Sequence, residues 1–330
     1  MPAYNRAHLI ERAVKSVLEQ IGEGDELIVI DDGSTDNTAE VMQPYLDRVK
    51  YIRIENLGAG HARNRGVAEA RGELVAFIDS DDGWMPGKIE MQKKLFVALP
   101  EMLFCFSDFA STDIHGTVYR RHLPTWHNDT RSWDEILGKG KPMSSVIDLP
   151  EGMDDFNFHM GDLSVPEMKS AYVFTSTVVA RREEAGDTLH FAEDVPTFED
   201  LECFGRMALK GKAVYLDTET AWQHGESPDR LSAAKSYDRS TSRLIVLERV
   251  WGQNKAFLER HDQEYRDTVD ETRLWRIADL ILMGRTGEAR KELARVQRYP
   301  LSYKLLASLP GSAARGLLAI RRVLRSGVGA

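Results

Sequence analysis

The chain has 330 residues, a formal net charge of −9, 42% hydrophobic residues and two cysteines. This apolar content excludes an intrinsically disordered protein, and so few cysteines exclude a disulfide scaffold and fit a reducing, cytoplasmic setting. No run of 18 apolar residues is present, so we expect no membrane-spanning helix, and the acidic balance argues against a nucleic-acid partner.

Helix and strand patterns alternate through the first 110 residues. Apolar residues on one face predict a helix over 6–20, and a continuous apolar run predicts a strand buried on both faces over 26–31. The elements expected next are a helix from 35 to about 49, a strand over 51–54, a helix over 58–70, a strand over 74–78, a helix over 86–97 and a strand over 103–109. This alternation predicts an α/β fold with right-handed crossovers and a mainly parallel sheet.

The remainder of the chain divides into a weakly patterned stretch and a helical end. Residues 110–170 carry scattered Gly, Pro, Asp and His, which predict loops, a short hairpin and an adaptable lid. A strand over 171–179, a helix over 198–210, a strand over 213–216 and helices over 231–260, 265–283 and from 285 are expected next. We therefore expect one domain over 1–227 and a helical region over 228–330.

The charge is unevenly distributed along the chain. Residues 285–330, called the basic tail below, contain ten Lys or Arg and two Glu, a net charge of +8 that leaves −17 on the rest. The apolar residues 317–320 and 323–324 alternate with arginines in this tail. The pattern is typical either of a solvated helical face or of an amphipathic helix that lies on a membrane surface.

Two acidic clusters follow buried strands. Asp31 and Asp32 end the first of these strands, and the segment from Asp79 through Ser80 and Asp81 to residue 82 ends another. Turn formation and helix capping explain such residues in the simplest case. Three carboxylates within four residues repel one another, however, and hard oxygen ligands of this kind suit Mg²⁺ or Mn²⁺.

Three further candidates lie at helix starts and strand ends. Arg63 follows a glycine-opened helix start, which suits an anionic ligand, although a solvated basic face is the simpler explanation. Glu199 and Asp200 begin a helix, where they either complement its dipole or supply a carboxylate base. His224 follows a strand as a structural residue or as a ligand for metal or phosphate. Because ligands bind at the carboxyl ends of the strands in α/β sheets, these clusters together predict a pocket for a divalent cation and a nucleotide.

Four ordered segments resemble a known family. The segments 2–5 (PAYN), 30–36 (IDDGSTD), 56–66 (NLGAGHARNRG) and 77–86 (FIDSDDGWMP) are similar to those of family 2 glycosyltransferases with the GT-A fold. The resemblance is dense over residues 2–95 and looser through 199–200 and 224. It implies a Rossmann-like GT-A domain over 1–227, with a nucleotide-binding half over 1–100 and an acceptor-binding half over 101–227.

The resemblance also implies a reaction and site roles. The family transfers a sugar from a nucleotide-diphosphate donor, here expected to be a UDP-sugar, usually with inversion and with Mn²⁺ or Mg²⁺, to a glycan or lipid-linked acceptor. The implied roles are nucleoside binding by Pro2, Ala3 and Tyr4, base contact by Asp32 or Asp31, base or phosphate contact by Arg63, ribose-side contact by Asp79 with Ser80 beside it, metal binding by Asp81 and His224, and general-base catalysis by Asp200 with Glu199 beside it. A lipid-linked acceptor would favour a peripheral position at the inner face of a membrane, reached through the basic tail.

The start of the chain departs from the family pattern. The apolar strand that normally precedes the first segment is absent before Met1, and we expect the protein to begin upstream. The missing strand also keeps open a nucleotide-sugar or glycan-binding protein without turnover. A sugar nucleotidyltransferase is a further alternative, although its glycine-rich, basic triphosphate loop is not visible near residue 1.

Overall fold

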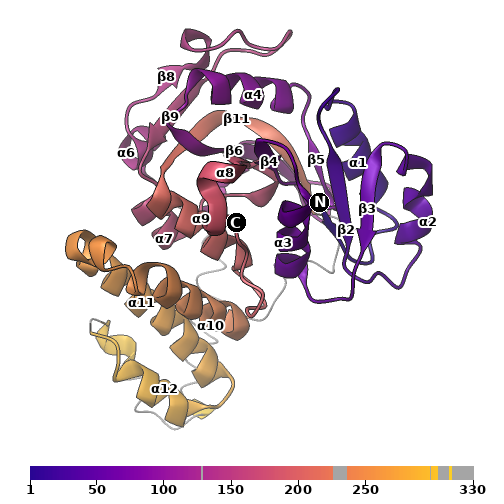
Figure 1. The fold of residues 1–330 in the computed structure, drawn as a ribbon. Coiled ribbons are helices and arrows are strands. Elements are labelled where there is room, and N and C mark those ends of the chain that lie inside the picture. Colours follow the sequence, from indigo (N-terminus) through magenta and orange to yellow (C-terminus); the bar gives the residue numbers. More distant parts are fainter. Residues whose placement is uncertain (128, 226–235, 298, 304–311, 314–330) are drawn as a thin grey trace. The chain divides into compact units, whose positions relative to one another are not determined.

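The computed structural model describes residues 1–127, 129–225, 236–297, 299–303 and 312–313 (Figure 1). The chain forms two compact units, one of Met1–Asp194 with Glu199–Arg230 and the other of Val195–Phe198 with Leu231–Ala330. The apolar and arginine-rich segment 314–330, the expected membrane-facing part of the basic tail, lies outside the described residues. So does the expected helix start at 231.

A small parallel sheet begins the first unit. Its strands run in the order β1 (Pro2–Ala3), β2 (Leu27–Asp31) and β3 (Val49–Arg53). Strand β2 is buried along its whole length because Leu27 and Val29 pack with α1 (Ile10–Leu18), whereas Ile28 and Ile30 pack with Ala62 of α3 (Ala59–Glu69). Strand β1 has two residues, which pair in parallel with β2.

A second, mixed sheet forms the centre of the first unit. Its main path runs β4–β10–β6–β11–β9–β8. The bounds are β4 (Leu74–Ala76), β5 (Asp82–Trp84), β6 (Met102–Thr112), β7 (Val118–Tyr119), β8 (Lys141–Pro142), β9 (Asn157–Gly161), β10 (Val179–Arg181) and β11 (Lys212–His224). Only the β6–β11 ladder is parallel among these described strands, and the other ladders are antiparallel. The expected mainly parallel pairing is therefore limited to the small sheet and this central pair.

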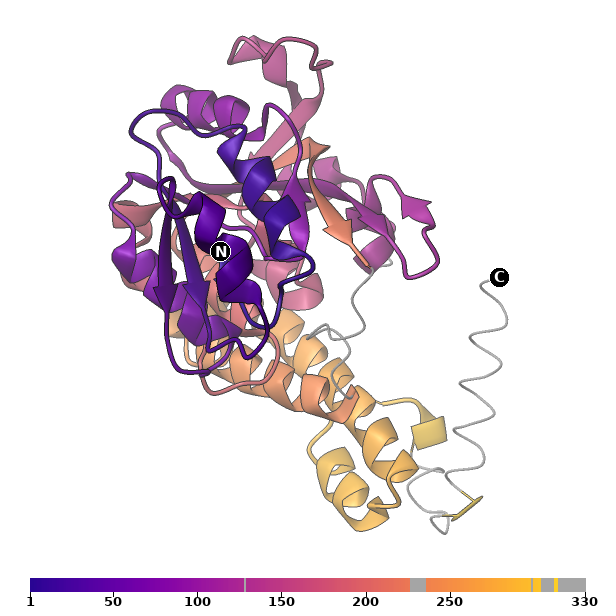
Figure 2. The same ribbon diagram turned by 90° about the vertical axis from the view of Figure 1, so that its right-hand side faces the viewer.

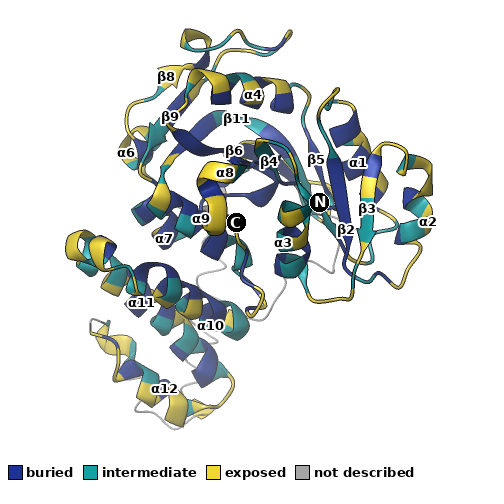
Figure 3. Ribbon diagram, viewed as in Figure 1, coloured by how far each residue is buried: buried dark blue, intermediate teal, exposed yellow. Residues whose placement is uncertain are grey.

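Short helices surround both sheets. The remaining elements of this unit are α2 (Thr38–Met42), η1 (Gln43–Tyr45), α4 (Lys88–Ala98), α5 (His122–His127), α6 (Trp133–Leu137), η2 (Met143–Ser145), α7 (Ser164–Ser170), η3 (Thr175–Thr177), α8 (Arg182–Ala185), η4 (Gly186–Thr188) and α9 (Glu199–Lys210). Strands β2 and β6 are mostly dark blue in Figure 3, so the core lies along them. The strand expected over 171–179 is wrong, since this buried run forms the 3₁₀ turn η3 and only then enters β10.

The described part of the second unit is helical apart from Val195–Phe198 (Figure 2). It contains α10 (Ser236–Leu247), the π-helical turn η6 (Glu248–Gly252), α11 (Lys255–Leu282) and α12 (Thr286–Leu293). The helix expected over 231–260 is interrupted earlier than predicted, by η6 and by Asn254, which caps α11 by accepting a hydrogen bond from the Phe257 N–H at 3.0 Å. The break expected at 260–265 is present as a kink within α11, where His261 has the non-helical angles φ −133° and ψ 26°. No helix of the described part of the chain has the length and apolar character needed to cross a membrane.

Candidate functional site

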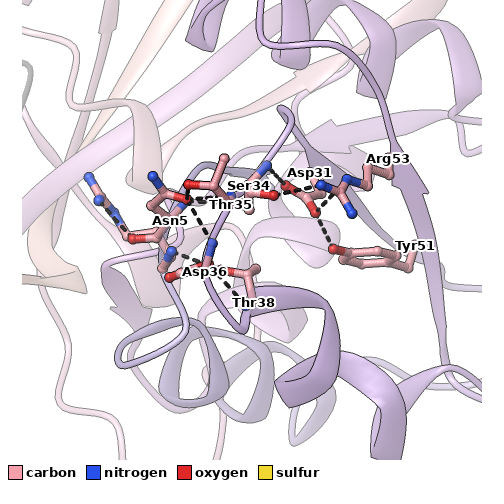
Figure 4. Close-up of polar contacts among 9 residues, drawn as sticks. Asn5, Asp31, Ser34, Thr35, Asp36, Thr38, Tyr51 and Arg53 are labelled. Carbon is pink, nitrogen blue, oxygen red and sulfur yellow. Dashed lines mark hydrogen bonds and ion pairs between the residues drawn. The ribbon is translucent and has the colours of Figure 1, made fainter.

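Asp31 and Asp32 lie at the carboxyl end of β2 and are held from within the chain. Asp31 is fully buried, and its carboxylate accepts hydrogen bonds from the Ser34 N–H at 2.8 Å and from the Tyr51 hydroxyl (Figure 4). Asp32 is 4% exposed and accepts the backbone N–H groups of Leu57 and Gly58 at 2.9 and 2.8 Å. Both carboxylates therefore stabilise the loops at this edge of the sheet by accepting backbone hydrogen bonds from them.

The loop after β1 is joined to the loop after β2 by a set of polar contacts. Asn5 adopts a left-handed backbone conformation, with φ of 52°, which asparagine tolerates better than most residues. Its N–H donates to the Ser34 Oγ at 2.9 Å, and its side-chain oxygen accepts the Thr35 N–H at 2.7 Å (Figure 4). Pro2 and Ala3 pair in register with Ile30 and Asp31. Predicted nucleoside-binding residues thus come together here, with the Tyr4 ring exposed beside them.

The second acidic cluster forms a tight turn after β4. The Asp82 N–H donates to the Asp79 carbonyl at 3.1 Å, and the side chain of Asp82 is buried. Ser80 is also buried, whereas the Asp81 side chain is 15% exposed and its Oδ2 lies 4.0 Å from an Arg6 guanidinium nitrogen. Asp81 is thus a partly open carboxylate between two buried neighbours.

His224 ends β11 beside this turn. The register pairs Gln223 with Asp82, and a Cβ added to Gly83 would lie 3.7 Å from the His224 Nε2. In the described part of the chain, no group of three or more His, Cys, Asp or Glu residues could hold a metal ion. A single carboxylate still fits a cation that arrives with a diphosphate, because Mg²⁺ commonly uses one or two carboxylates, substrate phosphates and water.

Arg63 connects the acidic turn to the start of α9. Its guanidinium donates to Asp79 Oδ1 and to Glu199 Oε1, both at 2.8 Å, and its side chain is only 6% exposed. Burial and the neighbouring Glu199 carboxylate raise the pKa of Asp200 to about 7, and Arg63 opposes that rise. The bridge therefore brings residues 79 and 199–200 into one cluster from parts of the chain 120 residues apart.

Three residues that received no role from the sequence, Asn64, Gly60 and Ser176, organise this cluster. Asn64 accepts the Phe191 N–H at 2.8 Å and donates to the Phe191 carbonyl at 2.9 Å, which fixes the segment before α9 against α3. Gly60 allows the same approach, since a Cβ there would lie 2.2 Å from the Ala192 carbonyl oxygen. Asn64 and Gly60 are part of the motif over 56–66. Ser176, the third residue, accepts the Asp79 N–H at 3.0 Å and carries no sequence signal beyond a polar triplet inside an apolar run.

Comparisons with known proteins agree on one family. The profile of Glycosyl transferase family 2 matches residues 1–142. A putative teichuronic acid biosynthesis glycosyltransferase, TuaG of Bacillus subtilis, is 38% identical over 264 residues, which cover 76% of this chain and 90% of TuaG. An uncharacterized glycosyltransferase of Nostoc sp. is 42% identical over 148 residues, and the match spans 44% of this chain and 41% of the Nostoc protein.

A third relative and a solved structure complete the comparison. The Escherichia coli UDP-Glc:alpha-D-GlcNAc-diphosphoundecaprenol beta-1,3-glucosyltransferase WfgD is 44% identical over 94 residues, or 28% of this chain and 37% of WfgD. The structure of S. aureus TarS 1–349 in complex with UDP superposes with a TM-score of 0.53 at 16% identity, covering 88% of this chain and 86% of the TarS 1–349 chain. At this identity the TarS structure supports the shared fold.

Proposed function

The chain belongs to glycosyltransferase family 2, and on that premise we propose that it transfers a sugar from a nucleotide-diphosphate donor to an acceptor hydroxyl with inversion. The carrying observation is the Arg63 bridge between Asp79 and Glu199. It joins Asp79, two residues before the partly exposed carboxylate of Asp81, to Glu199, which precedes the high-pKa carboxylate of Asp200. These are the parts that a metal-assisted displacement with a general base requires.

A UDP-sugar is the proposed donor. TarS is described with UDP and with UDP-GlcNAc, and WfgD is described as using UDP-Glc. We assign the nucleoside to the joined loops after β1 and β2, where Pro2, Ala3 and the exposed Tyr4 ring lie beside Asp31 and Asp32. In this proposal the two carboxylates hold the loops in the shape that borders the base.

Asp81 is the proposed carboxylate for Mn²⁺ or Mg²⁺, and His224 lies near enough to the turn to assist. When bound with the diphosphate, the cation would neutralise charge that develops on the leaving group. Arg6, whose guanidinium faces Asp81, would add a second positive charge near the same phosphates. Asp79 and Ser80 border the ribose side of the turn in this assignment.

Asp200 is the proposed base. A hydroxyl is a poor nucleophile until a base takes its proton, and a base is most effective when its pKa lies near the working pH. Burial and the Glu199 carboxylate raise the pKa of Asp200 to about 7, which fits this task. Glu199 itself is held by Arg63 and acts here by setting the field around Asp200.

The proposed acceptor is a glycan or a lipid-linked saccharide. TuaG is named for teichuronic acid biosynthesis, and the WfgD acceptor is a diphosphoundecaprenol-linked sugar. The basic tail would bring the protein to the membrane surface where lipid-linked acceptors lie. Co-sedimentation with anionic liposomes, compared between the full chain and a chain that ends at residue 284, tests the tail, and equal pelleting removes this part of the proposal.

A nucleotide-sugar screen tests the function. The full chain is incubated with UDP-sugars and other nucleotide sugars, with Mn²⁺, Mg²⁺ or EDTA, and the released nucleotide is measured. We expect release of UDP that requires a divalent cation. A parallel reaction contains UTP and a sugar phosphate, and release of pyrophosphate there would instead indicate a nucleotidyltransferase. Donor binding without turnover would indicate a binding protein.

A further inference from the structure

Ser176 lies directly behind the acidic turn over Asp79–Asp82. It belongs to η3 and is fully buried. Its Oγ accepts the Asp79 N–H at 3.0 Å and donates to the Asp82 Oδ2 at 2.5 Å. One hydroxyl therefore contacts both ends of the turn, and it comes from a residue nearly one hundred positions away in the chain.

The two hydrogen bonds of Ser176 to the turn are called the clamp below, and a third contact extends the clamp into β5. The Ser176 carbonyl accepts a hydrogen bond from the Trp84 indole Nε1 at 3.0 Å. The turn and β5 are thus tied to Ser176 at three positions: one backbone amide, one buried carboxylate and one indole. Since each of these groups is buried or partly buried, moving Ser176 would leave polar atoms unpaired, which is unfavourable.

The clamp has its own support from α4. The carbonyl of Thr177 accepts hydrogen bonds from the Lys88 Nζ at 2.9 Å and from the Gln92 Nε2 at 3.0 Å. Both donors are fully buried, and the Lys88 ammonium also lies 5.2 Å from the centre of the Trp84 ring. This shared carbonyl keeps η3 from shifting, because a shift would take the acceptor away from two buried donors.

Fixing both ends of the turn determines the direction of its middle. Asp81 lies between the two clamped residues, with its side chain partly open toward Arg6. We propose that Ser176 is a positioning residue, which holds the turn so that Asp81 faces the diphosphate and its cation. This inference rests on the proposed function, and it assigns to a remote serine the task of orienting a metal-binding carboxylate.

Manganese binding in the presence of UDP tests the inference without turnover. Free Mn²⁺ is measured by electron paramagnetic resonance as the full chain with saturating UDP is titrated. We expect Ser176→Ala to weaken Mn²⁺ binding about 10- to 100-fold, the range typical for loss of a group that supports a metal ligand. Ser176→Thr, which keeps the hydroxyl, is expected to restore most of the affinity.

Ser107→Ala is the matched control. Ser107 is also fully buried, and its Oγ donates to the Asp108 carbonyl and contacts the Thr220 Oγ1, both at 2.7 Å. Its loss removes a buried hydroxyl with two partners but leaves the acidic turn untouched. We expect Ser107→Ala to lower the melting temperature by an amount similar to Ser176→Ala and to leave Mn²⁺ affinity unchanged.

A double-mutant cycle tests whether the hydrogen bond between Ser176 and Asp82 carries the effect on Mn²⁺ binding. If Ser176 and Asp82 act together, the loss of Mn²⁺ affinity in Ser176→Ala with Asp82→Ala is smaller than the sum of the two single losses. If Ser176→Ala binds Mn²⁺ as tightly as the wild type, or if the losses in the cycle are additive, the positioning role of Ser176 is overturned and the proposed function still stands. If the unaltered protein shows no UDP-dependent Mn²⁺ binding, both this inference and the proposed metal-assisted function fail.

Discussion

The two acidic clusters resemble each other in sequence and differ in what their carboxylates bind. At the end of β2, Asp31 and Asp32 are buried and accept hydrogen bonds from the surrounding loops. At the end of β4, the outer carboxylates are held by Arg63 and Ser176, while Asp81 keeps a partly open side chain. The comparison teaches that acidic clusters at strand ends can differ in role: fully buried carboxylates stabilise the loops, whereas a carboxylate that stays partly exposed can meet a ligand.

Within the two acidic clusters, replacing Asp81 gives the largest expected effect. Asp81→Asn removes the partly exposed charge that we assign to the cation, so we expect donor turnover with Mn²⁺ to fall by about 10²–10³-fold, the range for loss of one electrostatic stabiliser. The melting temperature should change little. Nucleotide release and thermal unfolding, measured on the same preparation, check the two halves of this prediction. A large loss of stability with normal turnover would reverse the assignment of the two clusters.

Replacing Asp32 should give the opposite pattern. Asp32→Asn places an amide N–H₂ against the Leu57 and Gly58 N–H donors, so one hydrogen bond to a charged acceptor is lost. We expect the free energy of unfolding to fall by about 1.5–3 kcal/mol. Loosening of the loop should raise KM for the donor while kcat stays near its original value. Urea unfolding and steady-state kinetics provide the measurements, and a collapse of kcat would break the comparison.

The pH profile tests Glu199 and Asp200, the acidic pair at the start of α9. Asp200 must be ionised to act as a base, so kcat/KM should fall as the pH drops below about 7. Glu199→Gln removes the neighbouring negative charge that raises this pKa, and the acidic limb should move to lower pH. It should stay above the ordinary aspartate range because burial, the larger cause, remains. Values of kcat/KM measured from pH 5 to 9 test this shift. If the acidic limb does not move in Glu199→Gln, Asp200 is not the base that this limb reports.

Lys88 lies farthest from the proposed chemistry, and its titration tests the layer behind the turn. Burial lowers the pKa of Lys88 to about 7 from 10.5. Between these values the unfolded chain binds a proton that the folded chain does not, so this group makes stability rise with pH, by at most about 1.4 kcal/mol per pH unit. The stability difference between wild type and Lys88→Met should therefore grow from pH 7 to 9.5. Urea unfolding at both values measures it, and a constant difference would mean that Lys88 titrates normally.

Much of the small parallel sheet could be predicted because its signals are local. The apolar run that ends at Asp31 and the amphipathic pattern of α1 each identify one element and its buried faces. The strand expected over 171–179 was wrong because a continuous apolar run shows burial but not backbone conformation. The ladders of β8 and β9 depend on pairing between distant segments, which no local pattern contains.

The candidate site was predictable by residue type more than by contact. Asp79, Asp81 and Glu199–Asp200 were identified from their motifs, and the structure brings residues 79 and 199 together on Arg63. That Arg63 is buried between two carboxylates could not be read from the sequence, since it depends on α9 folding back beside α3. The same limit applies to Ser176, whose partners lie nearly one hundred residues away.

Asp200→Asn provides the most direct test of the central claim, that the Arg63-linked cluster is one transfer site with Asp200 as its base. UDP binding with Mn²⁺ is measured by calorimetry, and UDP release from the donor found in the screen is measured in parallel. The account predicts that Asp200→Asn binds UDP as the wild type does and loses turnover by about 10²–10⁴-fold. Turnover within a few-fold of the wild type would contradict it.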